Sequence, residues 1–312
     1  MHWNFLHFEK YHLPLDDSIS QFVQWLVENY RHIFQAMKWP VEQTLDKIDA
    51  GFNTLPPWVV ILALSLLAWK VSGKGLAVFS LISLILIGFL GLWEDTMTTL
   101  AMVLSSVLFC ALVGIPVGIL AGRNDTVHVW LRPVLDAMQT TPAFVYLVPI
   151  VMLFSIGNVA GVLATIIFSL PPIVRLTSLG IRQVHPELIE AALAFGATNR
   201  QVLWRVQFPA ALPTILAGLN QTIMMALSMV VIASLIGAGG LGEPVVRSLN
   251  TLDIGMAAIG GLATVLLAVL LDRITQVGAR CEGQQFLLGR VRNLESADEF
   301  LQGFAGYAFA PG

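Results

Sequence analysis

Charged residues are scarce in this sequence, since Asp, Glu, Lys and Arg make up only 12% of its 312 residues. A soluble globular chain carries roughly a quarter. Hydrophobic residues account for 56% of the chain, and its mean hydropathy is +0.76. Because so little polar surface cannot cover a water-soluble fold of this length, the composition excludes an ordinary soluble protein and predicts an integral membrane protein.

Several other features are missing. The net charge of −3 leaves no basic surplus for a nucleic-acid partner, and the two cysteines, Cys110 and Cys281, indicate no redox or metal role. The chain contains neither H-E-x-x-H nor a P-loop G-K-[ST], so we expect no zinc site, no ATPase site, no cofactor and no catalytic residue of its own. Charged residues and histidines stand where a signal peptide would be apolar, so insertion is expected to rely on internal spans.

Long apolar segments are plentiful from Leu55 onward. A transmembrane helix needs roughly 17 to 25 such residues, and Trp58, Trp69 and Trp93 fall at segment ends, where membrane interfaces favour tryptophan. The sequence therefore predicts an all-α polytopic membrane protein with about seven transmembrane helices. These are 55–72, 75–93, 96–121, 142–157, 159–181, 209–236 and 255–272.

The cations indicate an orientation, because cytoplasmic segments carry an excess of Lys and Arg. An N-out, C-in arrangement places 12 of the 17 on the cytoplasmic side. They are Lys70, Lys74, Arg123, Arg132, Arg175, Arg182, Arg200, Arg205, Arg273, Arg280, Arg290 and Arg292. The opposite arrangement would put the same residues outside.

The chain divides into four predicted parts. Residues 1–54 form an amphipathic extracytoplasmic tail, read as two helices separated at Pro40, and 55–93 are two accessory spans. Residues 94–276 form the transmembrane core, with a cytoplasmic loop at 182–208, and 277–312 are a cytoplasmic tail. Prolines at 116, 149, 171 and 172 lie inside predicted spans, where a kinked helix either lines a transport pathway or simply packs.

The loop at 182–208 is the longest polar interruption after residue 55. Pro186 is placed to begin a helix, with Glu187 in its first turn, and Gly196 ends or breaks it before a second short amphipathic helix. Two short helices around a glycine turn form a compact knob that suits docking into a soluble partner. An ordinary connecting loop remains the alternative.

The spacing within this loop resembles the EAA loop of ABC importer permeases, E-A-A-x3-G-x9-I-x-L-P. The matching residues are Glu190, Ala191, Ala192, Gly196, Val206, Phe208 and Pro209, with Val206 in place of isoleucine and Phe208 in place of leucine. Residues 131–154, 166–181 and 219–242, together with the N-terminal run 11–31, further resemble glycine betaine/L-proline betaine permeases of that family.

The resemblance implies a type I ABC importer permease fold in the bacterial inner membrane and a function in betaine uptake for osmoprotection. It implies two cytoplasmic ATPase subunits, a second copy of the permease, and a periplasmic or extracellular substrate-binding protein. By the same resemblance, Glu190, Ala191, Ala192, Gly196, Val206 and Pro209 would couple the permease to the ATPase. A permease for choline or an amino acid, a channel and a scaffold are the alternatives.

Two further patterns lie in the region 219–242. Asn220, Thr222, Ser228 and Ser234 are polar residues within a span that either line the substrate pathway or hold helices together. Residues 237–242 satisfy G-x-G-x-x-G, but an apolar span precedes them instead of a strand, so we expect a close-packed turn and not a dinucleotide site.

Overall fold

The computed structural model describes residues 15–276 and is all-helical over that range. This confirms the predicted fold class. The helices are α1 (Leu15–Thr54), α2 (Pro57–Ser72), α3 (Lys74–Phe89), α4 (Trp93–Arg123), α5 (Asp125–Thr140), α6 (Ala143–Phe154), α7 (Asn158–Arg182), α8 (Pro186–Ala194), α9 (Asn199–Val202), α10 (Phe208–Ala233), α11 (Gly242–Thr251) and a last helix, Ile254–Gln276. The predicted tail at 277–312, with Cys281, lies outside the described residues.

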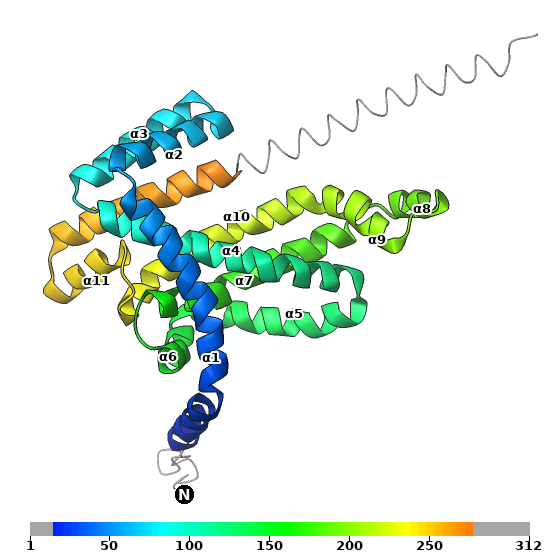
Figure 1. Cartoon of the computed structure of the whole chain (residues 1–312), viewed down its shortest axis with the longest axis horizontal. Helices are drawn as coiled ribbons and strands as arrows, with labels where there is room; N and C mark the ends of the chain where they lie inside the picture. The colour runs from blue at the N-terminus through cyan, green and yellow to red at the C-terminus, as the bar shows by residue number, and fades with distance from the viewer. Residues whose placement is uncertain (1–14, 277–312) are drawn as a thin grey trace, which may run out of the picture.

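The centre of the molecule is a bundle of α4, α7 and α10, which run along its long axis (Figure 1). Glycines on α4 allow α7 to approach closely. A Cβ added to Gly118 would lie 2.5 Å from the Cβ of Thr177, and one added to Gly114 would lie 2.4 Å from Ile173. At these glycines there is no room for a side chain, so the backbone of α4 packs directly against side chains of α7. Small residues allow such close approach in membrane bundles.

Four of the predicted spans fall in helices that are long and apolar enough to cross a membrane: α4, α7, the 199–236 segment that contains α10, and Ile254–Gln276. The others are shorter or bent. α6 has only 12 residues and makes an angle of 98° with α5, while the Phe34–Thr54 part of α1 makes 105° with α2. The predicted crossing at 142–157 is therefore one limb of a bent helix pair, and the number and orientation of the crossings stay predictions.

The N-terminal segment is one helix and not two. The prediction of a break at Pro40 was wrong, because α1 continues through it. The proline removes only one backbone donor, and the carbonyl of Pro40 accepts a hydrogen bond of 2.7 Å from the Thr44 hydroxyl. Val41 and Leu45 are buried in the main core, so α1, which crosses the bundle steeply in Figure 1, is fastened to it by its C-terminal half.

The prolines predicted to kink the spans also lie within continuous helices, Pro116 in α4, Pro149 in α6, and Pro171 and Pro172 in α7. Arg175, which the charge count assigns to the cytoplasmic side, lies inside the predicted span 159–181 and inside α7, seven residues before the helix ends at Arg182. A cation within a membrane-spanning helix needs a partner or a polar cavity.

Candidate functional site: the loop between α7 and α10

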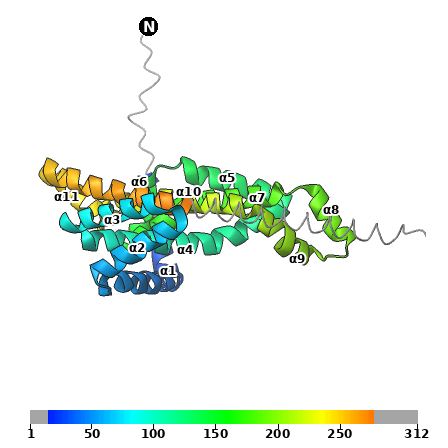
Figure 2. The same cartoon turned by 90° about the horizontal axis from the view of Figure 1, so that it is seen from above.

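The loop that carries the EAA-like spacing projects from one end of the molecule. In both views α8 and α9 lie at the end opposite α11 (Figures 1 and 2). Pro186 begins α8, as predicted, and Glu187 lies in its first turn, where a negative charge favours the helix dipole. None of the residues of α8 is buried, so this helix is available to a partner.

Gly196 ends α8 in a Schellman turn. Its φ is +82°, and its N–H donates to the carbonyl of Leu193 at 2.9 Å. The N–H of Ala197 then donates to the carbonyl of Ala192 at 3.0 Å. These two bonds are the pattern that closes a helix with glycine in the left-handed conformation. The E-A-A-x3-G spacing therefore matches a helix whose C-terminus is closed by glycine. Ala192 lies three residues before the C-cap, Phe195.

The chain turns at once into the second helix. Thr198 and Gln201 form a capping box, in which the Gln201 N–H donates to the Thr198 hydroxyl and the Gln201 side chain accepts from the Thr198 N–H at 2.8 Å. The chain then continues through a π-helical turn, Leu203–Gln207, directly into α10. Val206 and Pro209 lie half-buried at this junction. The second helix predicted from the sequence is not separate, because it continues into α10.

Apolar side chains on the surface of the loop were missed by sequence reasoning. Phe195 is 93% exposed, Trp204 53% and Leu193 44%. Glu190 and Ala191 are also exposed, beside the half-buried Ala192. The signal available in the sequence was the pair of large aromatic residues in an otherwise polar loop. The loop therefore exposes large apolar side chains together with the charged Glu190, a mixture that is common where proteins dock.

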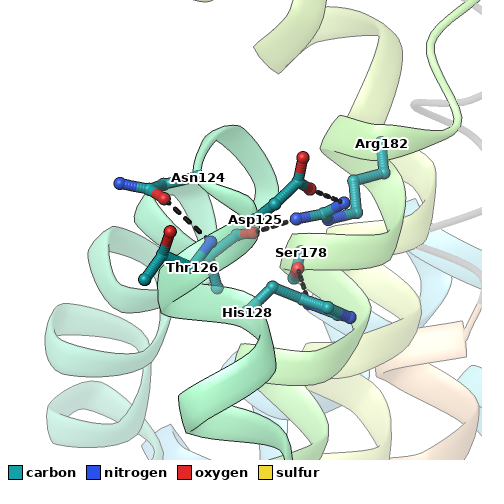
Figure 3. A network of polar contacts seen from close by, with 7 residues as sticks. Asn124, Asp125, Thr126, His128, Ser178 and Arg182 are labelled. Atoms are coloured by element: carbon teal, nitrogen blue, oxygen red, sulfur yellow. Dashed lines mark hydrogen bonds and ion pairs between the residues drawn. The ribbon is translucent and has the colours of Figure 1, made fainter.

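Arg182 anchors the loop to two other helices (Figure 3). Its guanidinium lies 2.7 Å from a carboxylate oxygen of Asp125 at the start of α5 and donates to the carbonyl of Ala121 near the end of α4 at 2.9 Å. Asn124 caps α5 by accepting from the Thr126 N–H at 3.0 Å, which fixes the position of Asp125. The last residue of α7 therefore joins the ends of three helices just before the loop begins.

The four polar candidates for the substrate pathway are spread along α10 and the turn after it and are not gathered in one place. Thr222, Ser228 and Ser234 each donate to a backbone carbonyl of their own helical turn, at 2.9, 3.0 and 2.6 Å. Asn220 accepts from the Thr275 hydroxyl and so joins α10 to the last helix. Ser228 is exposed, whereas Thr222 and Ser234 are buried.

The glycine-rich segment 237–242 forms a tight turn between α10 and α11. Gly237 and Gly240 have φ of +74° and +90°, and a Cβ on Gly240 would lie 2.5 Å from the Thr99 hydroxyl. The Asn158 side chain accepts from the Gly239 N–H at 2.7 Å, and the Thr99 hydroxyl accepts from the Leu241 N–H at 2.8 Å. Helices, not a strand, flank this turn, which agrees with the close packing expected from the sequence.

Comparison with known proteins gives a consistent family. The sequence model described as "Binding-protein-dependent transport system inner membrane component" matches residues 114–280. The chain is 52% identical over 280 residues to the glycine betaine/proline betaine transport system permease protein ProW of Escherichia coli, covering 89% of this chain and 79% of that protein. It is 46% identical over 264 residues to the glycine betaine transport system permease protein OpuAB of Bacillus subtilis, covering 85% and 94%.

Solved structures agree on the fold. Two crystal forms of the MetNI methionine ABC transporter in inward-facing conformations align with TM-scores of 0.54 and 0.52, at 24% and 27% identity. They cover 59% and 60% of this chain and 92% of each matched chain. The likeness confirms the predicted type I ABC importer fold. The family implies an ATPase and a substrate-binding protein as partners. The chain belongs to the inner membrane components of binding-protein-dependent transport systems.

Proposed function

We propose that this chain is the permease subunit of an ATP-driven importer for glycine betaine, proline betaine and similar osmoprotectants in the bacterial cytoplasmic membrane. The observation that carries the proposal is the 52% and 46% identity, over most of the chain, to permease proteins named for glycine betaine. In this proposal two copies of the permease join two cytoplasmic ATPase subunits, and an external binding protein delivers the solute. The chain itself hydrolyses no ATP.

The 182–208 loop would make the contact with the ATPase. Glu190, Ala191, Ala192, Gly196, Val206 and Pro209 are the proposed coupling residues. The exposure of α8 and of Phe195 supports the proposal, because an apolar group so exposed is stabilised when a partner covers it. When ATP binding closes the ATPase pair, the loops move with it. The Arg182 anchor and the direct junction into α10 would carry that motion to the bundle.

The proposed arrangement in the membrane keeps the N-terminal side outside and residues 277–312 inside. Residues 1–54 would form an extracytoplasmic tail, and residues 55–93 would form two accessory transmembrane helices beside the core at 94–276. The position of the loop at one end of the molecule, opposite α11, supports a cytoplasmic loop and an external α11 (Figure 2). The pathway residues Asn220, Thr222, Ser228 and Ser234 remain candidates.

Uptake into vesicles that contain the complete transporter and its binding protein tests the proposal. Radiolabelled glycine betaine should enter only with ATP, and unlabelled glycine betaine and proline betaine should compete. If only choline or methionine competes, the importer carries another solute, and the proposal that the chain is a permease still stands. Uptake without ATP would indicate a channel, and no uptake of any of these solutes would indicate a scaffold.

A further inference from the structure

A cavity of about 250 Å³ lies between α4, α5 and α7, and its lining includes Ala121, whose carbonyl accepts from Arg182. Its polar lining consists of His128, Arg132, Asp136, Arg175 and Ser178. Leu131, Leu135 and Val174 supply an apolar wall. The cavity therefore combines charges of both signs with an apolar surface, within the part of the chain that the family model covers.

Arg175 lies well inside α7, a helix long and apolar enough to cross a membrane. α7 has 25 residues, and Arg175 lies five residues from its centre, which corresponds to about 8 Å along the helix axis. With α7 centred in the bilayer, Arg175 lies inside a hydrocarbon layer whose half-thickness is about 15 Å. Ionisable residues at such depth face a bundle interior or a water-filled cavity and mark substrate pathways.

Arg175 has a partner across the cavity. Its guanidinium lies 2.5 Å from a carboxylate oxygen of Asp136 on α5, and Arg132 approaches the same carboxylate at 4.0 Å. The side chains of Arg175 and Asp136 are nevertheless 45% and 51% exposed. The pair is thus accessible to a solute, unlike a buried structural ion pair.

We propose that this cavity is a low-affinity binding site for a small zwitterion with a carboxylate and a quaternary ammonium group. The carboxylate replaces Asp136 on the Arg175 guanidinium, which can bind it through two parallel hydrogen bonds. The quaternary ammonium has no N–H to donate, so it is held by the charge of Asp136 and the wall formed by Leu131, Leu135 and Val174. The site rests on the proposed function, since betaines are solutes of this class.

The charges of the cavity can hold both ends of a zwitterion. When a solute carboxylate binds Arg175, Arg132 still lies 4.0 Å from Asp136, so Asp136 keeps a cationic neighbour. The solute's ammonium group adds a second positive charge beside Asp136. A zwitterion therefore gives Arg175 and Asp136 new partners and leaves the net charge of the cavity unchanged, whereas a lone anion or a lone cation changes it.

Saturation-transfer NMR on the permease–ATPase complex in nanodiscs, without nucleotide and without the binding protein, tests the site. The observed signal is the trimethylammonium protons of glycine betaine, and the lipid is phosphatidylglycerol, so no zwitterionic headgroup competes. We expect saturable binding that is weaker for tetramethylammonium and for acetate. Arg175→Gln and Asp136→Asn should each weaken it about 10- to 100-fold, the scale of one charge-assisted hydrogen bond. Asp136→Glu should retain part of the binding.

Asp125→Asn is the matched control, because it removes the other ion pair between α5 and α7 while keeping every charge of the cavity. It should bind glycine betaine like the unmodified protein. Equal losses in Asp125→Asn and Arg175→Gln would show that the attachment of α5 matters and not the cavity charges, which overturns the site. Loss of the signal on adding phosphatidylethanolamine would assign the cavity to a lipid headgroup and also overturn it.

Uptake by the unmodified transporter separates this inference from the function on which it rests. If the vesicles import glycine betaine but the NMR signal is the same in Arg175→Gln as in the unmodified protein, the site is wrong and the function stands. If the vesicles import no betaine, the function itself fails.

Discussion

Replacing Gly196 isolates the contribution of one backbone conformation to coupling. A Cβ at this position would meet nothing within 4 Å, so alanine causes no clash. Its cost comes from φ of +82°, a left-handed conformation that disfavours an L side chain by about 1–2 kcal/mol. That energy lowers the equilibrium constant for forming the turn by a factor of about 5–30. Asparagine tolerates this conformation better and should cost less, whereas a β-branched valine should cost more.

The measurement is betaine uptake per ATP hydrolysed by the complete transporter in vesicles, together with hydrogen exchange of residues 186–202. Coupling should fall in the order Gly, Asn, Ala, Val, and exchange of the Ala197 N–H should rise in the same order, because its bond to Ala192 depends on the turn.

Gly91 provides a matched control. It has φ of +75°, has nothing within 4 Å of an added Cβ, and ends α3 with the same pair of hydrogen bonds, Gly91 N–H to Gly88 and Leu92 N–H to Ile87. Gly91→Ala should carry a similar local strain without loss of coupling. Full coupling in Gly196→Ala, or an equal loss in Gly91→Ala, would refute the reasoning.

Three other changes have expected outcomes. Gly118→Ala should destabilise the permease by about 1–3 kcal/mol by overpacking against Thr177, seen as a lower thermal aggregation temperature, whereas Gly261→Ala, with open space around it, should not. Arg182→Gln should lower uptake per ATP while the ATPase stays bound, and Arg182→Lys should restore part of it; unchanged coupling would argue against the anchor. Phe195→Ala should weaken ATPase binding to the solubilised permease by about 10-fold or more, in a pull-down titration. Leu252→Ala, at a residue that is 86% exposed just after α11, should leave that binding unchanged.

The features that sequence predicted correctly are those set by local rules. Pro186 and Gly196 bound α8 because proline suits the first turn of a helix and glycine suits the turn that ends it. The long apolar runs likewise become helices because lipid leaves the backbone no other way to satisfy its hydrogen bonds. The exposed Phe195 and Trp204 could have been suspected, since large apolar residues in the longest polar interruption of the sequence need an explanation.

The features that sequence missed depend on tertiary contacts. Pro40 does not end α1, and Val41 and Leu45, which follow the proline, are buried against the core and hold this part of the helix in place. The bend between α5 and α6 and the pairing of Arg175 with Asp136 follow from packing that no local pattern records. A charge count treats every cation near a span end as a loop residue, and Arg175 is a cation that finds its partner on another helix.

α7 connects the proposed coupling loop with the proposed zwitterion site. Arg175, Ser178 and Arg182 follow one another at intervals of three and four residues, so they share one face of the helix. That face meets α5 through Asp136, His128 and Asp125 in turn. Because α7 ends at the proposed coupling loop, a movement of the loop would reach the Arg182–Asp125 pair first and the Arg175–Asp136 pair two helical turns later. A displacement of α7 relative to α5 would therefore change the distance between the charges that we propose hold the zwitterion, which gives ATP binding a direct way to alter solute affinity.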